Sequence, residues 1–250
     1  MKKRFNIFFI LLISLFCSCS SYKNIPYYQD LNRNAATQES IANYVPNTLQ
    51  KGDMLGINVT SRSPESSAIF NYSSKDISSS VTGYVIDNNG AINLPLIGAL
   101  KVDGMTLTAL QGKLNEMLTP FYKDPVTNIR ILNFRVAVYG DVLKPDVYVI
   151  KDEKITITQA LTLAGDLNIT AMRKNVILVR EEEGKRKFIP VDLTSKNIFS
   201  SPYYYLRSND EIYVTPDKTK YGTVERGTKT TSLILSGLSV AAIVLSIIYR

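Results

Sequence analysis

The sequence predicts an α+β protein made of two small folded units in series, followed by a C-terminal apolar helix. Short stretches of alternating apolar and polar residues are separated by Gly, Asn and Asp, which is the pattern of strands joined by tight turns. Each unit also contains one short segment with apolar residues at helical spacing. The third observation is the uncharged run Thr231–Tyr249, which as a helix spans roughly 28 Å, close to the thickness of a bilayer core.

The N-terminus has the layout of a secretory signal. A basic start and the short apolar stretch Phe5–Phe16 lead to the window Phe16-Cys17-Ser18-Cys19, which resembles a bacterial lipobox. We predict a signal peptide at 1–18, lipid attachment at Cys19 and a pattern-poor tether over 19–45. Cleavage before Cys19 removes the other cysteine, so the mature chain has no free thiol. The alternative is an ordinary cleaved signal with two incidental cysteines.

Composition excludes several classes of function. The chain of 250 residues contains no His, and of its two cysteines one lies in the signal and the other is the predicted lipid-attachment residue, so most nucleophilic triads and zinc sites are unavailable. The net charge of +7 falls to +4 without the three basic residues of the signal, and no basic cluster indicates nucleic-acid binding. Asp141 and Asp146 could form the carboxylate pair of a glycan enzyme, but nothing around them supports catalysis. We predict no enzyme, catalytic residue, metal site or cofactor.

The first unit is predicted over residues 46–132. The turn Gly52-Asp53 leads into a strand at 55–59, and a polar loop follows at 62–80. A helix with one apolar face begins after Thr106 or Thr108 and ends near Thr119.

The segment from Gly83 to Gly98 has the strongest local pattern in this unit. It predicts a hairpin in which a strand at 84–86 turns at Asn88-Asn89-Gly90 and returns at 92–97. Pro95 cannot donate a backbone hydrogen bond, so it places the returning stretch at a sheet edge or a strand end.

The second unit is predicted over residues 133–216. A short helix begins after Thr156 or Thr158 and ends before Gly165, and a hairpin turns at Glu183-Gly184. The predicted strands occupy 136–139, 147–150, 176–180, 187–191 and 206–214. Two strands, a helix, a hairpin and a final strand form a β-grasp-like α+β pattern.

This ordered set of turns and strands resembles the bacterial outer-membrane polysaccharide export lipoproteins. The residues that carry the resemblance are Gly52, Asp53, Gly83, Gly90, Pro95 and Gly98 in the first unit, and Gly140, Asp141 and Asp210 in the second. By resemblance, 46–132 is a polysaccharide export domain and 133–216 is a soluble-ligand-binding β-grasp (SLBB) domain. Asp146 and Asn209 stand where the family usually has Gly. Asn tolerates the left-handed region, so the second departure is mild.

The resemblance implies a lipoprotein of the bacterial outer membrane with its body in the periplasm. It further implies a ring-shaped homo-oligomer that forms a channel for capsular or extracellular polysaccharide, supplied by an inner-membrane polysaccharide copolymerase/tyrosine kinase. The alternative function is a periplasmic glycan-binding or adaptor lipoprotein with a simple C-terminal anchor.

We predict a linker at 217–230 and a membrane-spanning helix at 231–249. Four serines lie along one face of this helix, Ser232, Ser236, Ser239 and Ser246. They either line a wet lumen or let helices pack closely, and both interpretations imply oligomerisation. The basic residues preceding the run outnumber Arg250 after it, which argues against a plain inner-membrane anchor.

The aromatic residues are 15 Tyr and 9 Phe, with no Trp, and Tyr203–Tyr205 is the densest cluster. This cluster could stack on sugar or lie at an interface between protomers. The commoner outcome for such a run is that one ring packs inward beside a strand and the others stay exposed.

Overall fold

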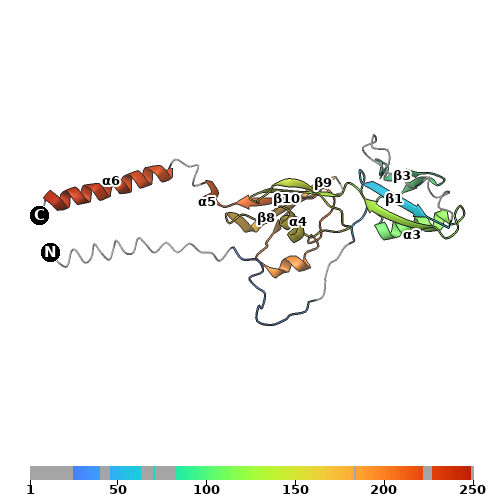
Figure 1. Cartoon of the computed structure of the whole chain (residues 1–250), viewed down its shortest axis with the longest axis horizontal. Coiled ribbons are helices and arrows are strands. Elements are labelled where there is room, and N and C mark those ends of the chain that lie inside the picture. Colours follow the sequence, from blue (N-terminus) through green and yellow to red (C-terminus); the bar gives the residue numbers. More distant parts are fainter. Residues whose placement is uncertain are drawn as a thin grey trace.

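The computed structural model describes residues 25–39, 46–62, 70, 83–182, 184–221 and 227–248. Figure 1 shows two bodies in line, with the helix α6 at one end. Each body has its own hydrophobic core, one built between Leu49 and Tyr122 and the other between Phe134 and Val214. We call them the N-terminal lobe (46–132) and the C-terminal lobe (133–216). Both contain helices and strands, which confirms the mixture of helices and strands expected of the predicted α+β class. Cys19 and the signal predicted at 1–18 lie outside the described residues.

The N-terminal lobe is an antiparallel sheet with one helix on it. The sheet order is β2-β1-β5, with β1 at Met54–Thr60, β2 at Tyr84–Val85 and β5 at Val126–Ile131. The helix α3 covers Leu107–Leu118, and Thr106 caps it by accepting a hydrogen bond from the backbone N–H of Ala109. Its residues Leu110, Leu114 and Leu118 are buried, as their helical spacing predicts.

The predicted hairpin of this lobe has a different partner in the structure. The turn at Asn88-Asn89-Gly90 is present, but β2 pairs with β1. The strand after the turn, β3 (Ala91–Leu94), instead pairs with β4 (Gly98–Lys101). Pro95 ends β3 because it has no N–H for a strand ladder, and Leu96 completes the turn with a φ of 63°. The single returning strand predicted over 92–97 is therefore wrong.

A five-stranded mixed sheet forms the C-terminal lobe. Its order is β7-β6-β10-β8-β9, and only the β6–β10 pair is parallel. The strands are β6 at Arg135–Gly140, β7 at Asp146–Val149, β8 at Ala171–Glu182, β9 at Lys185–Val191 and β10 at Glu211–Pro216. The β8–β9 hairpin is longer than the predicted strands at 176–180 and 187–191.

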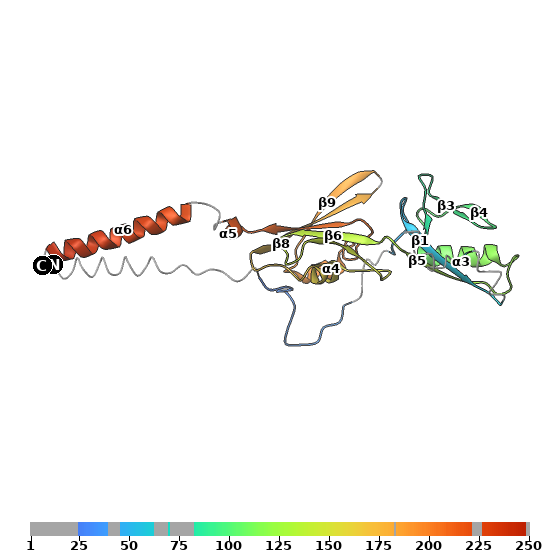
Figure 2. The same cartoon turned by 45° about the horizontal axis from the view of Figure 1, so that its top comes forward.

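The helix α4 (Ile157–Leu163) lies along one side of this sheet (Figure 2). Thr156 and Gln159 form a reciprocal capping box at its start, so Thr156 rather than Thr158 is the cap. Gly165 follows the helix with a φ of +76°, the left-handed conformation that commonly ends helices. A short 3-10 helix, η3 (Lys196–Ser200), completes the lobe.

The described part of the predicted tether docks on the C-terminal lobe. The Tyr27 hydroxyl donates to Asp166 Oδ1, and the Gln29 N–H donates to the Thr194 carbonyl at 2.7 Å. Asp30 accepts hydrogen bonds from Ser195 Oγ at 2.7 Å and the Lys196 N–H at 2.6 Å. This docking is not predicted from the sequence, because the adjacent Tyr27 and Tyr28 follow neither the apolar period of a strand nor that of a helix.

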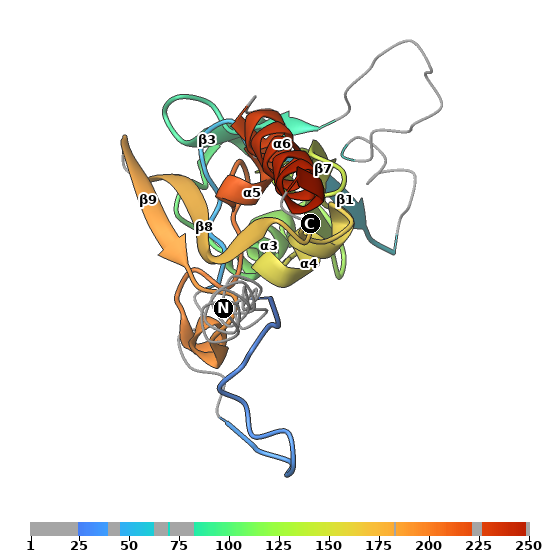
Figure 3. The same cartoon turned by 90° about the vertical axis from the view of Figure 1, so that its left-hand side faces the viewer.

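The chain leaves the C-terminal lobe through α5 (Lys218–Tyr221) and α6 (Gly227–Ile248). Figure 3 views the molecule from this end, with α6 and α5 in front. Across the described stretches of the chain, no helix has the length and hydropathy needed to cross a bilayer, so the membrane-spanning helix predicted at 231–249 is not supported. On α6, the hydroxyls of Ser236 and Ser239 donate to the carbonyls of Leu233 and Ser236, three residues earlier.

Candidate functional site

The turn Gly52-Asp53 organises the start of the N-terminal lobe. Gly52 has a φ of +86°, and its N–H donates to the Ile86 carbonyl at 2.9 Å. The buried Asp53 carboxylate accepts from the Gln50 N–H at 2.9 Å. Burial raises the pKa of Asp53, and the nearby Asp103 adds to this effect. These contacts assign the Gly-Asp pair a structural role.

The other predicted turn residues of this lobe pack close to the same region. A Cβ on Gly90 would lie 2.6 Å from the Asp103 Cβ, and one on Gly83 would lie 2.7 Å from Met54 Cγ. Gly98 also has a positive φ, of 79°, but open space surrounds it. Pro95 and Gly98 belong to the β3–β4 hairpin, away from the Gly52-Asp53 turn.

The turn Gly140-Asp141 lies where β6 runs beside β10. Gly140 has a φ of +101°, and a Cβ there would lie 2.1 Å from the Val214 carbonyl oxygen, so only glycine fits. The fully buried carboxylate of Asp141 accepts from Lys220 Nζ at 2.6 Å, Thr170 Oγ1 at 2.6 Å and Asn168 Nδ2 at 2.9 Å. Burial opposes ionisation of Asp141, but the hydrogen bonds, first that from Lys220, outweigh it and hold its pKa below the ordinary value.

Asp210 forms the second buried ion pair of the C-terminal lobe. Its carboxylate lies 2.6 Å from Arg180 Nη2, and both side chains are almost fully buried. Arg180 also donates to the Tyr205 carbonyl at 3.1 Å and lies over the Tyr203 ring, 5.5 Å from its centroid. Asn209 has a φ of 65°, so it occupies the left-handed conformation that a glycine would otherwise supply.

A cleft of about 1040 Å³ separates the two lobes. Asn47 crosses the junction by donating to the Leu206 carbonyl at 3.2 Å, and Asn133 joins the lobes by donating to the Gly52 carbonyl at 2.9 Å. The cleft is lined mainly by polar and charged residues, including Lys51, Asp103, Glu181, Glu182, Arg186 and Arg207. Lys187 and Arg207 lower the pKa of Glu182 to about 2, so this side of the cleft stays charged at neutral pH.

Six of the predicted motif residues fall into two groups in the structure. Gly52, Asp53, Gly83 and Gly90 support the N-terminal lobe near the cleft, whereas Gly140 and Asp141 lie where α5 leaves the C-terminal lobe. The carboxylate of Asp141 is fully engaged, and Asp146 is exposed and accepts the N–H of the next residue, so the two do not form a catalytic pair. Among the described residues, no three His, Cys, Asp or Glu side chains gather as metal ligands.

Sequence reasoning missed Lys220, Arg180 and Tyr27. Each pairs with a partner far away in the sequence, and only Arg180, a charged residue within an apolar strand pattern, gave any local signal. The Tyr203–Tyr205 cluster packs in part: Tyr203 and Tyr204 lie against the core of the C-terminal lobe, and Tyr204 contacts Tyr205 and Phe199 edge-on.

Residues 42–132 match the family model of the polysaccharide biosynthesis/export proteins. The chain is also similar to two relatives, each named EPS I polysaccharide export outer membrane protein EpsA. It is 29% identical over 139 residues to the protein of Ralstonia solanacearum, which covers 54% of this chain and 37% of the relative. It is 35% identical over 94 residues to the protein of Ralstonia nicotianae, which covers 36% of this chain and 25% of the relative.

The chain thus spans little more than a third of one relative and a quarter of the other. The family match falls on the N-terminal lobe, where the motif turns Gly52-Asp53, Gly83 and Gly90 support the fold. Residues 42–132, which include the N-terminal lobe, are thus similar to the polysaccharide biosynthesis/export proteins.

Proposed function

We propose that this protein is a lipid-anchored component of the bacterial outer membrane that exports a capsular or extracellular polysaccharide through an oligomeric channel. The match of residues 42–132 to the polysaccharide biosynthesis/export proteins carries the proposal. Both relatives bear names that place them in the outer membrane as polysaccharide export proteins. In this proposal Cys19 carries the lipid, the two lobes lie in the periplasm, and an inner-membrane copolymerase/tyrosine kinase delivers the polymer.

The C-terminal lobe is proposed to be an SLBB-type β-grasp domain. Its mixed sheet packs around α4, with β6 and β10 as the parallel central pair. Three motif segments of this lobe form parts of its fold: the turn Gly140-Asp141 at the end of β6, the segment from Thr158 to Gly165 with α4, and the closing strand β10 after Asp210. The lobe would act as a rigid spacer and assembly surface in the exporter.

The sheet of this lobe supports self-association. On its open face, defined here as the face opposite α4, the strand register sets Tyr139, Tyr213, Ile177 and Pro190 beside one another on four adjacent strands. The neighbouring row brings Val147, Ala137, Val179 and Phe188 to the same face, interrupted by Glu211. Phe188 is 67% exposed and Val147 is 54% exposed. An apolar sheet face of this extent is typical of a protein interface.

We propose that α6 takes part in the same assembly. Leu233, Val240 and Ile247 are exposed, so water surrounds its aliphatic side in the isolated chain. The face formed by Ser232, Ser236, Ser239 and Ser246 is proposed either to allow close helix packing or to line a lumen.

The first experiment combines export and assembly. A strain without this protein should lose surface polysaccharide, and the wild-type gene should restore it. The Phe188→Asp variant should fail to restore export and should lower the mass of the detergent-extracted oligomer, because a charge on the open face prevents protomer contact. Phe121→Asp is the matched control, since Phe121 is 53% exposed on the other lobe.

Two results would contradict the proposal. Normal surface polysaccharide in the strain without the protein would remove the export function. A detergent-extracted protein that is monomeric and binds glycan with a defined affinity would instead support the adaptor function.

A further inference from the structure

Four exposed apolar side chains gather at one end of the C-terminal lobe. They are Leu143 in the β6–β7 turn, Leu163 at the end of α4, Ile169 in the following loop and Met172 at the start of β8, and they are 62%, 47%, 70% and 40% exposed. Backbone hydrogen bonds join these segments, from the Leu143 N–H to the Asp166 carbonyl at 3.1 Å and from the Lys144 N–H to the Ala164 carbonyl at 2.8 Å. We call this end, with its four side chains, the α5 pole.

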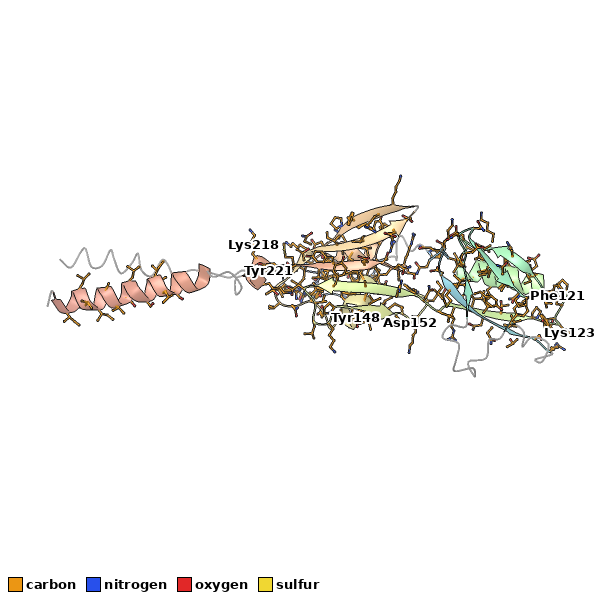
Figure 4. All side chains as sticks on the ribbon, turned by 90° about the horizontal axis from the view of Figure 1, so that it is seen from above. Phe121, Lys123, Tyr148, Asp152, Lys218 and Tyr221 are labelled. Carbon is orange, nitrogen blue, oxygen red and sulfur yellow. The ribbon has the colours of Figure 1, made fainter. Side chains whose placement is uncertain are left out.

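The same pole holds both chain segments that lead away from the lobes. Tyr27 of the N-terminal segment donates to Asp166, and Lys220 of α5 pairs with Asp141, which also accepts from Asn168 and Thr170. The loop at 166–170 therefore lies between the two attachment points. Figure 1 shows α5 at this end of the C-terminal lobe. Figure 4 shows Lys218 and Tyr221 at the same end, and Phe121 and Lys123 at the far end of the N-terminal lobe.

If Cys19 carries the lipid proposed above, chain length limits how far this pole lies from the lipid-bearing residue. Tyr27 lies eight positions after the predicted lipid-bearing Cys19, and a fully extended chain of eight residues spans at most about 29 Å. With the lipid on Cys19, as proposed above, the docking of Tyr27 on Asp166 keeps the lipid-bearing residue within this distance of Tyr27 at the α5 pole.

The residue types at the α5 pole are those expected at a lipid interface. Moving exposed apolar side chains out of water lowers the free energy of the system. Tyr221, Lys144 and Lys218 are exposed at the same end. Tyrosine is enriched at membrane interfaces, and lysine can lay its aliphatic stem along lipid while its ammonium stays in water.

We propose that the α5 pole contacts the phospholipid surface of the outer membrane, with Leu143, Leu163, Ile169 and Met172 inserted at the boundary between headgroups and acyl chains. The proposal depends on the outer-membrane location proposed above. It assigns the C-terminal lobe a fixed orientation, with the N-terminal lobe pointing away from the bilayer.

The absence of Trp from the chain allows a direct test. Single Trp residues are introduced into the full chain as Leu143→Trp, Leu163→Trp, Ile169→Trp and Met172→Trp, with Phe121→Trp as the control. Each protein is reconstituted into phosphatidylcholine vesicles with or without brominated acyl chains, and flotation of the vesicles verifies membrane association. Bromine should quench the fluorescence of the four pole variants and leave that of Phe121→Trp unchanged.

Three results would overturn the proposal. Flotation without quenching at the pole shows that the pole lies away from lipid, while the membrane location stands. The pole fluorescence could instead be unquenched but blue-shifted, and return to longer wavelength when the oligomer dissociates. That result shows that a second copy of the chain, and not lipid, covers the pole. If neither the variants nor the wild-type protein float with the vesicles, the proposed outer-membrane location is itself contradicted. Four independent positions guard against one substitution that disturbs folding.

Discussion

Lys220 Nζ lies 2.6 Å from Asp141 Oδ1, an ion pair between residues 79 positions apart that fixes α5 on the C-terminal lobe. The carboxylate is fully buried and the ammonium is partly exposed. Two further side chains donate to the carboxylate, and the backbone N–H of Asp141 donates to the Val214 carbonyl at 2.9 Å. The buried Asp141 carboxylate therefore helps to hold α5 against the C-terminal lobe.

Replacing Asp141 by Asn should destabilise the protein in a pH-dependent way. The pKa of Asp141 is lowered on folding, so its contribution is complete above the ordinary value of 3.8 and is lost as the pH falls toward the depressed value. We expect Asp141→Asn to lower the free energy of unfolding by about 1–3 kcal/mol at pH 7. Urea unfolding at several pH values should show this difference shrinking below pH 3.8. A difference that is constant with pH contradicts the ion pair.

The variant Asp53→Asn should show the opposite pH dependence. Burial raises the pKa of Asp53, so the wild-type protein loses stability as the pH rises through the range between the ordinary and the raised values. The cost of Asp53→Asn should therefore be largest in acid and smaller at pH 7. The same urea series measures it, and a cost that grows with rising pH would show that Asp53 is stabilised as a carboxylate.

Replacing Gly140 by Ala should prevent stable folding of the C-terminal lobe. The added Cβ would lie 2.1 Å from the Val214 carbonyl oxygen in a backbone with positive φ, so β6 and β10 must separate. We expect a loss above about 3 kcal/mol, compared with about 1–2 kcal/mol for the control Gly98→Ala, which has a similar φ and no neighbour within 4 Å. Thermal unfolding followed by circular dichroism compares the two. Equal losses would show that φ alone, and not the close contact, limits position 140.

Replacing Asp210 by Ala should cost more than breaking a surface pair. Removal of the carboxylate leaves the buried Arg180 guanidinium without its charge partner, which typically costs about 3–5 kcal/mol. The control Glu181→Ala breaks the exposed contact with Arg186 and should change stability far less, because water screens that pair. Chemical denaturation provides both values, and a small cost for Asp210→Ala means that water reaches Arg180.

Replacing Tyr27 by Ala should release the N-terminal segment without unfolding the lobes. The substitution removes the hydroxyl contact with Asp166 and the ring that faces the Arg173 guanidinium at 5.8 Å. Hydrogen exchange should become faster over residues 25–39 and stay unchanged in β8 and β10, whose ladder does not involve Tyr27. Replacing the exposed Tyr221 by Ala is the control, and protection of 25–39 that survives Tyr27→Ala assigns the docking to Asp30 and Gln29.

The sequence allowed much of the fold to be predicted because local chemistry determines it. Thr106 and Thr156 were among the alternatives for helix caps, and both caps depend only on a hydroxyl placed before an apolar helical pattern. The Asn209 backbone was also predictable, since Asn readily adopts a positive φ. The sequence predicts the wrong partner for β3. The turn at Gly90 indicates that the chain reverses, but it does not show that β3 pairs with β4, beyond the next turn at Pro95, and not with β2.

Sequence by itself determined the alternation of short strands and helices, the motif turns and the absence of His, because each is read from neighbouring residues. Only the tertiary structure decided that Tyr27 docks on Asp166, that Lys220 neutralises Asp141 and that Arg180 is buried against Asp210. These contacts join residues 30 to 139 positions apart, and a charged side chain is buried only where the folded chain brings its partner within hydrogen-bond distance. The position of both exit segments at one pole follows from those long-range pairs and from no local pattern.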